Sequence, residues 1–142
     1  MLSEKIHASG HPNVSARHRT TFEITKENHL TPQGDCIIAI SADKGLTDLS
    51  SEFRAALKNE KTILEIKMSC GGIEENITAH GHPDLSFASH EEMVVRKSLF
   101  TCGRTLAVGA DKASCDLRRD FVKKLGEGKP LTVELTIINK NK

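Results

Sequence analysis

The six residues Gly10-His11-Pro12-Asn13-Val14-Ser15 occur a second time, slightly altered, as Gly81-His82-Pro83-Asp84-Leu85-Ser86. In both copies a glycine, which tolerates unusual dihedral angles, precedes a histidine and a proline that fixes φ and lacks an amide donor. An Asn or Asp then completes a composition that is typical of turns. A short segment of alternating polarity comes before each copy, so the phrase predicts a repeated strand-turn unit.

The repetition continues along most of the chain, in the same order in both halves. Residues 38–44, Ile-Ala-Ile-Ser-Ala-Asp-Lys, correspond to residues 106–112, Leu-Ala-Val-Gly-Ala-Asp-Lys. Such collinear matches predict an internal duplication. We expect one domain over 1–142, with a first half at about 4–70, a second half at about 74–139, and a pseudo-two-fold axis between them.

Composition and charge limit the class of protein. The chain has 142 residues, the length of one ordinary domain, and its formal net charge of +1 gives no broad attraction to nucleic acid or to a membrane. Trp and Tyr are absent, which argues against an aromatic platform for single-stranded nucleic acid. The sequence has no apolar stretch of transmembrane length and no signal-peptide core at its start. These features predict a cytoplasmic protein.

The cysteines show no metal-binding or redox spacing. Cys36, Cys70, Cys102 and Cys115 include no Cys-x-x-Cys pair and do not occupy equivalent places in the two halves. We interpret them as reduced thiols that are mostly buried, in preference to a zinc site or a disulfide framework. Cys36, beside Asp35, could be a nucleophile only if a histidine lies next to it in space.

Hydrophobic periodicity predicts the order strand-strand-strand-helix-strand in each half. The predicted strands of the first half are 4–9, 18–25, 36–40 and 63–68, with a helix that Thr47 or Asp48 caps at its start and that stops at Asn59. Those of the second half are 74–80, 90–97, 104–110 and 131–138, with a helix at about 116–125. The pattern predicts a mainly β fold with two helices, forming a jelly-roll-like sandwich or a flattened barrel. A double-psi-type barrel is the alternative.

Several stretches together resemble a known family. The segments are Gly10-His11-Pro12-Asn13, His18-Arg19-Thr20-Thr21, Leu30-Thr31-Pro32, Gly34-Asp35-Cys36-Ile37 and Ala42-Asp43-Lys44-Gly45. They are similar to an archaeal family of conserved uncharacterised proteins known as domain of unknown function 371. The resemblance covers nearly the whole chain and implies a small, mainly β, cytoplasmic archaeal protein. It implies no activity, substrate or catalytic residue.

Four histidines occur near the repeated turns, namely His11, His18, His82 and His90. If a two-fold axis brings them together, their imidazoles could bind a divalent metal such as zinc. Asp43 or Asp111 could then add a ligand or orient an imidazole. The alternative is that each Gly-His-Pro segment is a turn whose histidine bonds to the backbone.

Two repeated Asp-Lys pairs, Asp43-Lys44 and Asp111-Lys112, come between a predicted strand and a predicted helix. Free amides at a helix start, with an adjacent lysine, could hold a phosphate or a carboxylate. The alternative is a capping aspartate beside a solvated lysine.

The segment His18-Arg19-Thr20-Thr21 combines a base, a guanidinium and two hydroxyls that could recognise an anion. On a strand, however, alternate side chains point to opposite faces, so the four cannot line one pocket without a bulge. The alternative is ordinary strand surface.

These groups favour a small-molecule-binding or metal-assisted enzyme with a polar pocket near the axis. The candidate ligand-binding residues are His11, His18, Arg19, Asp43, Lys44, His82, His90, Asp111 and Lys112. The alternative is a non-catalytic interaction or assembly module, such as a β domain that dimerises through sheet edges or helix faces.

Overall fold

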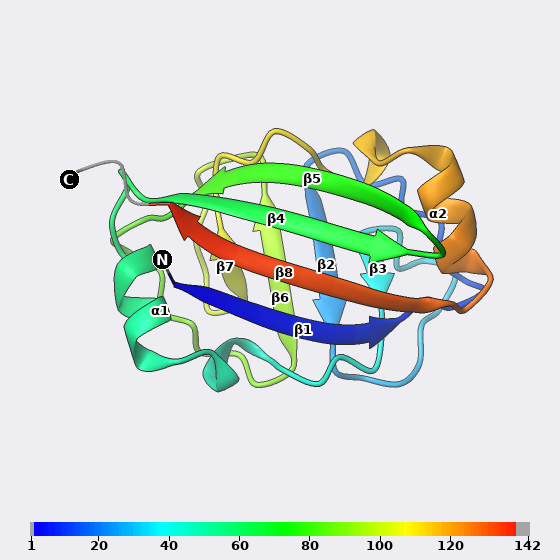
Figure 1. Cartoon of the computed structure of the whole chain (residues 1–142), viewed down its shortest axis with the longest axis horizontal. Coiled ribbons are helices and arrows are strands. Elements are labelled where there is room, and N and C mark those ends of the chain that lie inside the picture. The colour runs from blue at the N-terminus through cyan, green and yellow to red at the C-terminus, as the bar shows by residue number, and fades with distance from the viewer. Residues whose placement is uncertain (1, 139–142) are drawn as a thin grey trace.

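The structure is a computed structural model that describes residues 2–138. It contains two four-stranded sheets packed face to face (Figure 1). Met1 and residues 139–142 lie outside the described residues, and with them the last residue of the predicted second half.

The first sheet, called the long sheet, is antiparallel and has the strand order β1-β8-β4-β5. Apolar and polar residues alternate along its strands, because one face packs on the core and the other meets solvent. In β8, for example, Leu131, Val133, Leu135 and Ile137 are buried while the residues between them are partly exposed. The strands are β1 (Ser3–Ser9), β4 (Ile63–Cys70), β5 (Ile73–His80) and β8 (Pro130–Ile138).

The second sheet, called the short sheet, has the order β3-β2-β6-β7. Its two central strands are antiparallel, whereas each outer strand is parallel to its neighbour. In Figure 1 its strands lie behind the long sheet and cross it steeply, as in orthogonal sandwich packing. The strands are β2 (Thr21–Thr25), β3 (Ile37–Ala39), β6 (Glu92–Arg96) and β7 (Thr105–Ala107).

A short 3-10 turn precedes each helix. The turns are η1 (Leu46–Asp48) and η2 (Ser114–Asp116), and the helices are α1 (Ser51–Leu57) and α2 (Arg119–Gly126). The predicted start of the first helix at Thr47 or Asp48 is wrong, since Ser50 caps α1 by accepting the Phe53 amide at 3.1 Å. Asp48 instead accepts the Gly45 amide at 2.8 Å and closes η1. The two helices lie at opposite ends of the sandwich (Figure 1).

The space between the sheets is filled by side chains. Phe22, Phe53 and Phe121 are among the largest fully buried residues. A void of about 10 Å³ remains between the sheets and is lined only by apolar residues. A void of this size and character stays dry and holds no ligand. This void is therefore not a candidate binding site.

The predicted mainly β fold with two helices is confirmed, whereas the flattened barrel and the double-psi-type barrel are wrong. The sheets touch at two isolated bridges, Ser9 with Ile40 and His80 with Val108, and no ladder continues from them. β3 and β7 have only three residues each, too few to extend these contacts into closed ladders. Across residues 2–138, no helix is long and apolar enough to cross a membrane.

Candidate functional site

The face of the short sheet that points away from the sandwich core carries polar side chains that are nevertheless buried. In β2, Phe22 and Ile24 face the other sheet and line the apolar void. Because side chains alternate along a strand, Thr21, Glu23 and Thr25 point the other way. Their exposed fractions are nevertheless only 9%, 5% and 0%. Buried polar groups that do not serve the core are candidates for function.

Glu23 is the charged residue at the centre of this face. Its Oε1 accepts a hydrogen bond from the Cys36 thiol at 3.8 Å and lies 3.9 Å from Nη1 of Arg104. The same Nη1 is 3.7 Å from Glu92. Burial, and secondarily the negative charge of Glu92, raise the pKa of Glu23, and Arg104 opposes the shift only in part. Glu23 therefore holds a proton more readily than an ordinary carboxyl group.

Strand pairing explains why Cys36 and Arg104 both contact Glu23. The antiparallel central pair sets Glu23 opposite Val94. The Glu23 amide donates to the Cys36 carbonyl at 2.9 Å, and the Val94 amide donates to the Arg104 carbonyl at 2.9 Å. Cys36 thus borders the central pair on the β3 side and Arg104 borders it on the β7 side.

Cys102 lies beside Arg104, where three donors surround its sulfur. Arg96 Nη2 is 3.3 Å from Sγ and Thr105 Oγ1 is 3.7 Å from it. Partial burial alone would raise the pKa of Cys102, but the Arg104 backbone amide, the Thr105 hydroxyl and the Arg96 guanidinium lower it to about 7. Donors and positive charge favour the thiolate, which is the nucleophilic form of cysteine.

Arg96 is held in place from two other directions. Its Nε donates to Thr105 Oγ1 at 2.8 Å, and its guanidinium lies 5.0 Å from the centre of the Phe100 ring. Phe100 and the preceding Leu99 are 60% and 67% exposed. The guanidinium therefore lies between the Cys102 thiol and an exposed apolar loop tip, a position that suits a ligand with an anionic group and an apolar part.

The second thiol in this region has the opposite character. Burial, and then the negative charges of Glu23 and Asp35, raise the pKa of Cys36 to about 11. Cys36 therefore stays protonated at neutral pH and donates to Glu23. The site, which we call the Cys102 site, consists of Glu23, Cys36, Glu92, Arg96, Cys102, Arg104 and Thr105.

The two Gly-His-Pro turns do not meet. His11 Nδ1 accepts the Asn13 amide at 2.9 Å, and His82 Nδ1 accepts the Asp84 amide at 3.0 Å. A Cβ on Gly10 would collide with the backbone of α2, whereas one on Gly81 would collide with the end of α1. Because α1 and α2 lie at opposite ends of the molecule, the two histidines are far apart.

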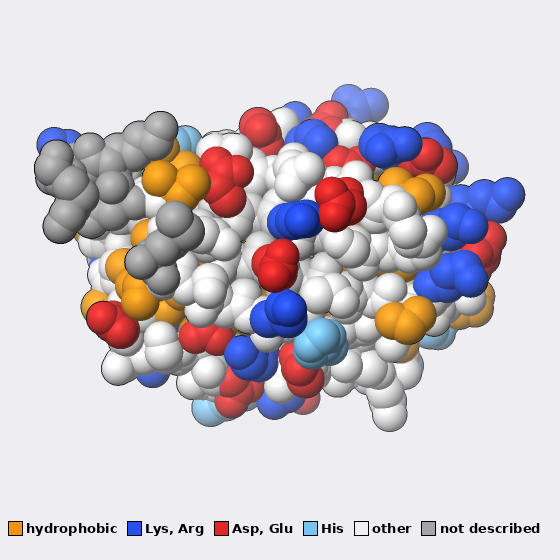
Figure 2. All heavy atoms as spheres, viewed as in Figure 1, with side chains coloured by type: hydrophobic (Ala, Val, Ile, Leu, Met, Phe, Trp, Pro, Cys, Tyr) orange, Lys and Arg blue, Asp and Glu red, His pale blue; other side chains and the backbone are white. Residues whose placement is uncertain are grey.

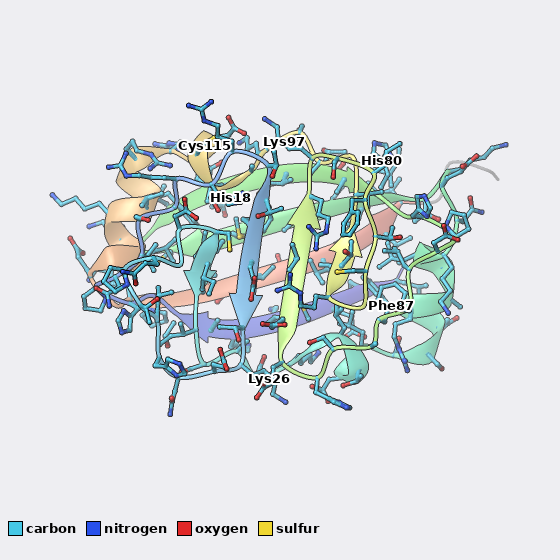
Figure 3. The ribbon with its side chains drawn as sticks, turned by 180° about the vertical axis from the view of Figure 1, so that it is seen from behind. His18, Lys26, His80, Phe87, Lys97 and Cys115 are labelled. Atoms are coloured by element: carbon cyan, nitrogen blue, oxygen red, sulfur yellow. The ribbon has the colours of Figure 1, made fainter. Side chains whose placement is uncertain are left out.

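His18 bonds to its own turn, whereas His90 contacts the other half of the chain. His18 Nδ1 accepts the Thr21 amide at 3.2 Å, and His90 Nδ1 lies 3.0 Å from Thr47 Oγ1. Figure 3 shows His18 near one end of β2, close to Cys115 and Lys97. The predicted four-histidine metal site is not formed, and residues 2–138 contain no group of three or more His, Cys, Asp or Glu residues placed to hold a metal ion. Arg19 is exposed on the segment before β2.

The two Asp-Lys pairs bind other parts of the chain. Asp43 accepts the His7 amide at 2.9 Å, and Asp111 accepts the Thr78 amide at 3.1 Å. Lys44 pairs with Glu4 at 2.8 Å and Lys112 with Glu75 at 2.6 Å. These contacts fix each strand-to-helix segment on the long sheet, and they occupy the lysines that the sequence offered for an anion.

Four residues of this site, Glu23, Arg96, Cys102 and Arg104, were not predicted from the sequence. Glu23 could have been noticed, because it is a charged residue between Phe22 and Ile24 in the middle of a predicted strand. Cys36 was considered as a nucleophile beside a histidine, but its contact is Glu23. The environment of Cys102 depends on Arg96, which lies on the neighbouring strand β6, and no local spacing indicates it.

Two comparisons place the chain among known proteins. The model of the family described as "Domain of unknown function (DUF371)" matches residues 6–138. The chain is also similar to the uncharacterized protein MJ0206 of Methanocaldococcus jannaschii, with 48% identity over 132 residues that cover 93% of this chain and 97% of that protein. A match over this span, together with the archaeal relative, confirms the resemblance seen in the sequence, and the chain belongs to the DUF371 family.

Proposed function

We propose that this chain is a small-molecule-binding enzyme that uses the Cys102 thiolate as a nucleophile. The observation that carries the proposal is the set of three donors around the Cys102 sulfur, two of which are Arg96 and the Arg104 amide. In this proposal the Arg96 guanidinium binds an anionic group of the substrate beside the thiolate. Glu23, on the other side of Arg104, supplies an acid-base group whose pKa is raised by burial.

We further propose that the two halves are related by a pseudo-two-fold axis, as an internal duplication predicts, within one jelly-roll-like sandwich. Exchange of the halves leaves the strand orders β1-β8-β4-β5 and β3-β2-β6-β7 unchanged, which supports an axis between β4 and β8 and between β2 and β6. The Cys102 site lies over the second of these pairs. The Cys102 site is therefore our candidate for the polar pocket predicted near the axis, but it is made of other residues than those predicted.

The site is not repeated in the two halves. The Glu23 amide donates to the Cys36 carbonyl, and in the second half the Val94 amide donates to the Arg104 carbonyl. Val94 therefore corresponds to Glu23, and Arg104 corresponds to Cys36. Gly34 stands where the second half has Cys102. We therefore propose a single reactive thiol per chain at this site, with contributions from both halves.

An activated ester tests the proposal directly. p-Nitrophenyl acetate should acetylate the Cys102 thiolate and release nitrophenolate, because attack of sulfur on the carbonyl carbon expels that leaving group. We expect a nitrophenolate burst that approaches one equivalent and an acetyl group on the peptide that contains Cys102. Cys102→Ser should abolish the burst, whereas Cys115→Ser, which removes an exposed thiol, should retain it. A burst that survives in Cys102→Ser would contradict the proposal.

The alternative function is a non-catalytic interaction module, and the exposed Leu99-Phe100 tip favours it. Two large apolar side chains at 67% and 60% exposure can form part of an interface between copies. Light scattering tests this function. A dimer that becomes a monomer in Leu99→Ser/Phe100→Ser would support it, and a monomer at all concentrations would exclude assembly through this tip.

A further inference from the structure

A groove lies between α2 and the segment 14–17, away from the Cys102 site. Its volume is about 500 Å³, and Val14 and Val122 form its apolar floor. The groove borders are polar or charged and comprise Ser15, Arg17, Arg119, Lys123 and Glu127. An apolar floor with charged borders is a common form of peptide-binding surface.

The groove lies in a basic part of the molecule. Segments 14–19 and 117–129 contain seven Lys and Arg residues against two acidic residues, although the whole chain has a net charge of +1. Figure 2 shows Lys and Arg side chains gathered at the α2 end, whereas positive and negative side chains alternate over the middle of the same view. The basic residues are Arg17, Arg19, Arg118, Arg119, Lys123, Lys124 and Lys129.

Two of these cations border the groove without a carboxylate partner. Within residues 2–138, Arg17 and Lys123 form no ion pair, whereas Arg118 pairs with Asp120 at 2.7 Å. Glu127, on the groove border, lies 3.9 Å from Lys124. Arg17 and Lys123 are exposed and are therefore available to an anionic partner.

Arg119 fixes the shape of the groove. Its guanidinium donates to the carbonyls of Ser15 and Ala16 at 3.4 and 3.1 Å, and also to those of Ser114 and Leu117 at 3.0 Å. These bonds join the segment 14–17 to the start of α2. A groove that is formed before binding costs a partner less ordering of the protein.

The α1 end has no basic side chains at the three positions that correspond to Arg17, Arg119 and Lys123. Ala88, Ser51 and Ala55 stand where the α2 end has Arg17, Arg119 and Lys123. If the basic side chains served only to hold a helix on the sandwich, α1 would need them too. Arg119 also serves the fold through its backbone contacts, whereas Arg17 and Lys123 form no ion pair within residues 2–138 and are available to a partner.

We infer that this groove binds an extended, acidic segment of a partner protein that also carries apolar side chains. The acidic side chains pair with Arg17 and Lys123, and the apolar ones lie on Val14 and Val122. A nucleic acid fits less well, because no aromatic residue lines the groove and stacking on aromatic faces holds single strands.

Fluorescence anisotropy with a short labelled peptide of alternating Glu and Leu tests the inference. The full chain should bind this peptide saturably, more weakly as salt rises, and should not bind a matched peptide of Gln and Leu. Arg17→Ala/Lys123→Ala, which installs the residues of the α1 end, should weaken binding about tenfold or more. Lys58→Ala/Lys61→Ala removes the same charge at the α1 end and should leave binding unchanged.

Three results would overturn the inference. These are the absence of saturable binding, an equal effect of the two double variants, and tighter binding of an oligothymidylate that is lost in Arg17→Ala/Lys123→Ala. The last result would assign the groove to nucleic acid. We expect both variants to fold, since all four side chains are exposed, and circular dichroism checks this.

Discussion

At the residue scale, Cys102 differs from the other cysteines through its neighbours. Cys70 is buried, and burial raises its pKa. The pKa of Cys36 is raised to about 11. Cys115 is exposed, and Cys102 has an intermediate exposure together with a pKa lowered to about 7. Reactivity should therefore follow the electrostatic environment and not the exposure.

Alkylation by iodoacetamide as a function of pH measures this difference. Because its pKa is about 7, Cys102 is half thiolate at neutral pH, whereas a thiol at the ordinary value of 9.0 is about 1% thiolate. We expect the Cys102 rate to rise with a midpoint near pH 7 and to exceed that of the more exposed Cys115 at neutral pH. Peptide mass spectrometry reads both rates in one sample.

Arg96→Gln provides the matched control for this measurement, since it keeps a donor and removes the charge. The midpoint for Cys102 should move to higher pH. A midpoint near the ordinary value in the unmodified chain would contradict the described environment of the sulfur.

Glu23 should reduce the stability of the fold at neutral and alkaline pH. Its raised pKa means that its contribution to stability is present below the ordinary value of 4.5 and is lost as the pH rises through the raised value. Glu23→Gln removes the buried charge and should stabilise the chain by about 1 kcal/mol at pH 8. Thermal melting should show this difference shrinking as the pH falls toward 4.5.

Glu92→Gln is the comparison for this effect, because the Glu92 side chain is 30% exposed against 6% for Glu23. It should change the melting temperature less. Destabilisation by Glu23→Gln at pH 8 would show that the pair with Arg104 outweighs the cost of burial.

At the scale of elements, two carboxylates join the long sheet to the helices. Glu75 of β5 pairs with Lys112 and accepts the Arg118 amide before α2. Glu4 of β1 pairs with Lys44 at 2.8 Å and accepts the Ser50 amide at 2.8 Å before α1. Each carboxylate thus fixes a strand, a 3-10 turn and a helix start to one another.

Removal of these two carboxylates should destabilise the fold unequally. The Glu75 side chain is 1% exposed and that of Glu4 is 11% exposed. Water can therefore replace fewer of the hydrogen bonds that are lost with Glu75. We expect Glu75→Ala to cost about 3 kcal/mol because it removes a buried carboxylate that binds both the partly exposed Lys112 and the Arg118 amide. Glu4→Ala should cost about 1 kcal/mol. Urea unfolding of both variants at pH 7 measures the difference, and equal losses would contradict it.

At the scale of the molecule, each ladder of the long sheet joins strands from different halves of the sequence. β1 pairs with β8, β8 with β4, and β4 with β5. The central pair of the short sheet, β2 with β6, also crosses between halves. Within a half, only the short parallel pairs β2-β3 and β6-β7 remain.

Separate polypeptides of residues 1–71 and 72–142 should therefore be unfolded alone. Neither retains a long-sheet ladder, and a strand without partners is not stable in water. Mixing them should restore β structure, because every long-sheet ladder then has both strands. Circular dichroism of each fragment and of the mixture tests this, and a cooperative melt of either fragment at concentrations where it is monomeric would contradict it.

The sequence by itself determined the elements and their order, because hydrophobic period and turn residues are local properties. The alternation of Leu131, Val133, Leu135 and Ile137 sufficed to predict β8, and Gly10 and Gly81 marked the turns after β1 and β5. Shorter strands were predicted too long: 18–25 became Thr21–Thr25, and the Thr20 amide before the strand donates to the His18 ring at 3.3 Å.

Only the tertiary structure decided which polar side chains meet. The repeated histidines, aspartates and lysines were visible in the sequence, and all but His90, which contacts Thr47 of the other half, bond within their own half. Glu23 comes from the first half and Arg96 and Cys102 from the second, and none of the three is repeated as the same residue type in the other half. They are brought together by the pairing of β2 with β6 and of β6 with β7, and the pKa of a thiol is set by such contacts in space, which sequence spacing does not encode.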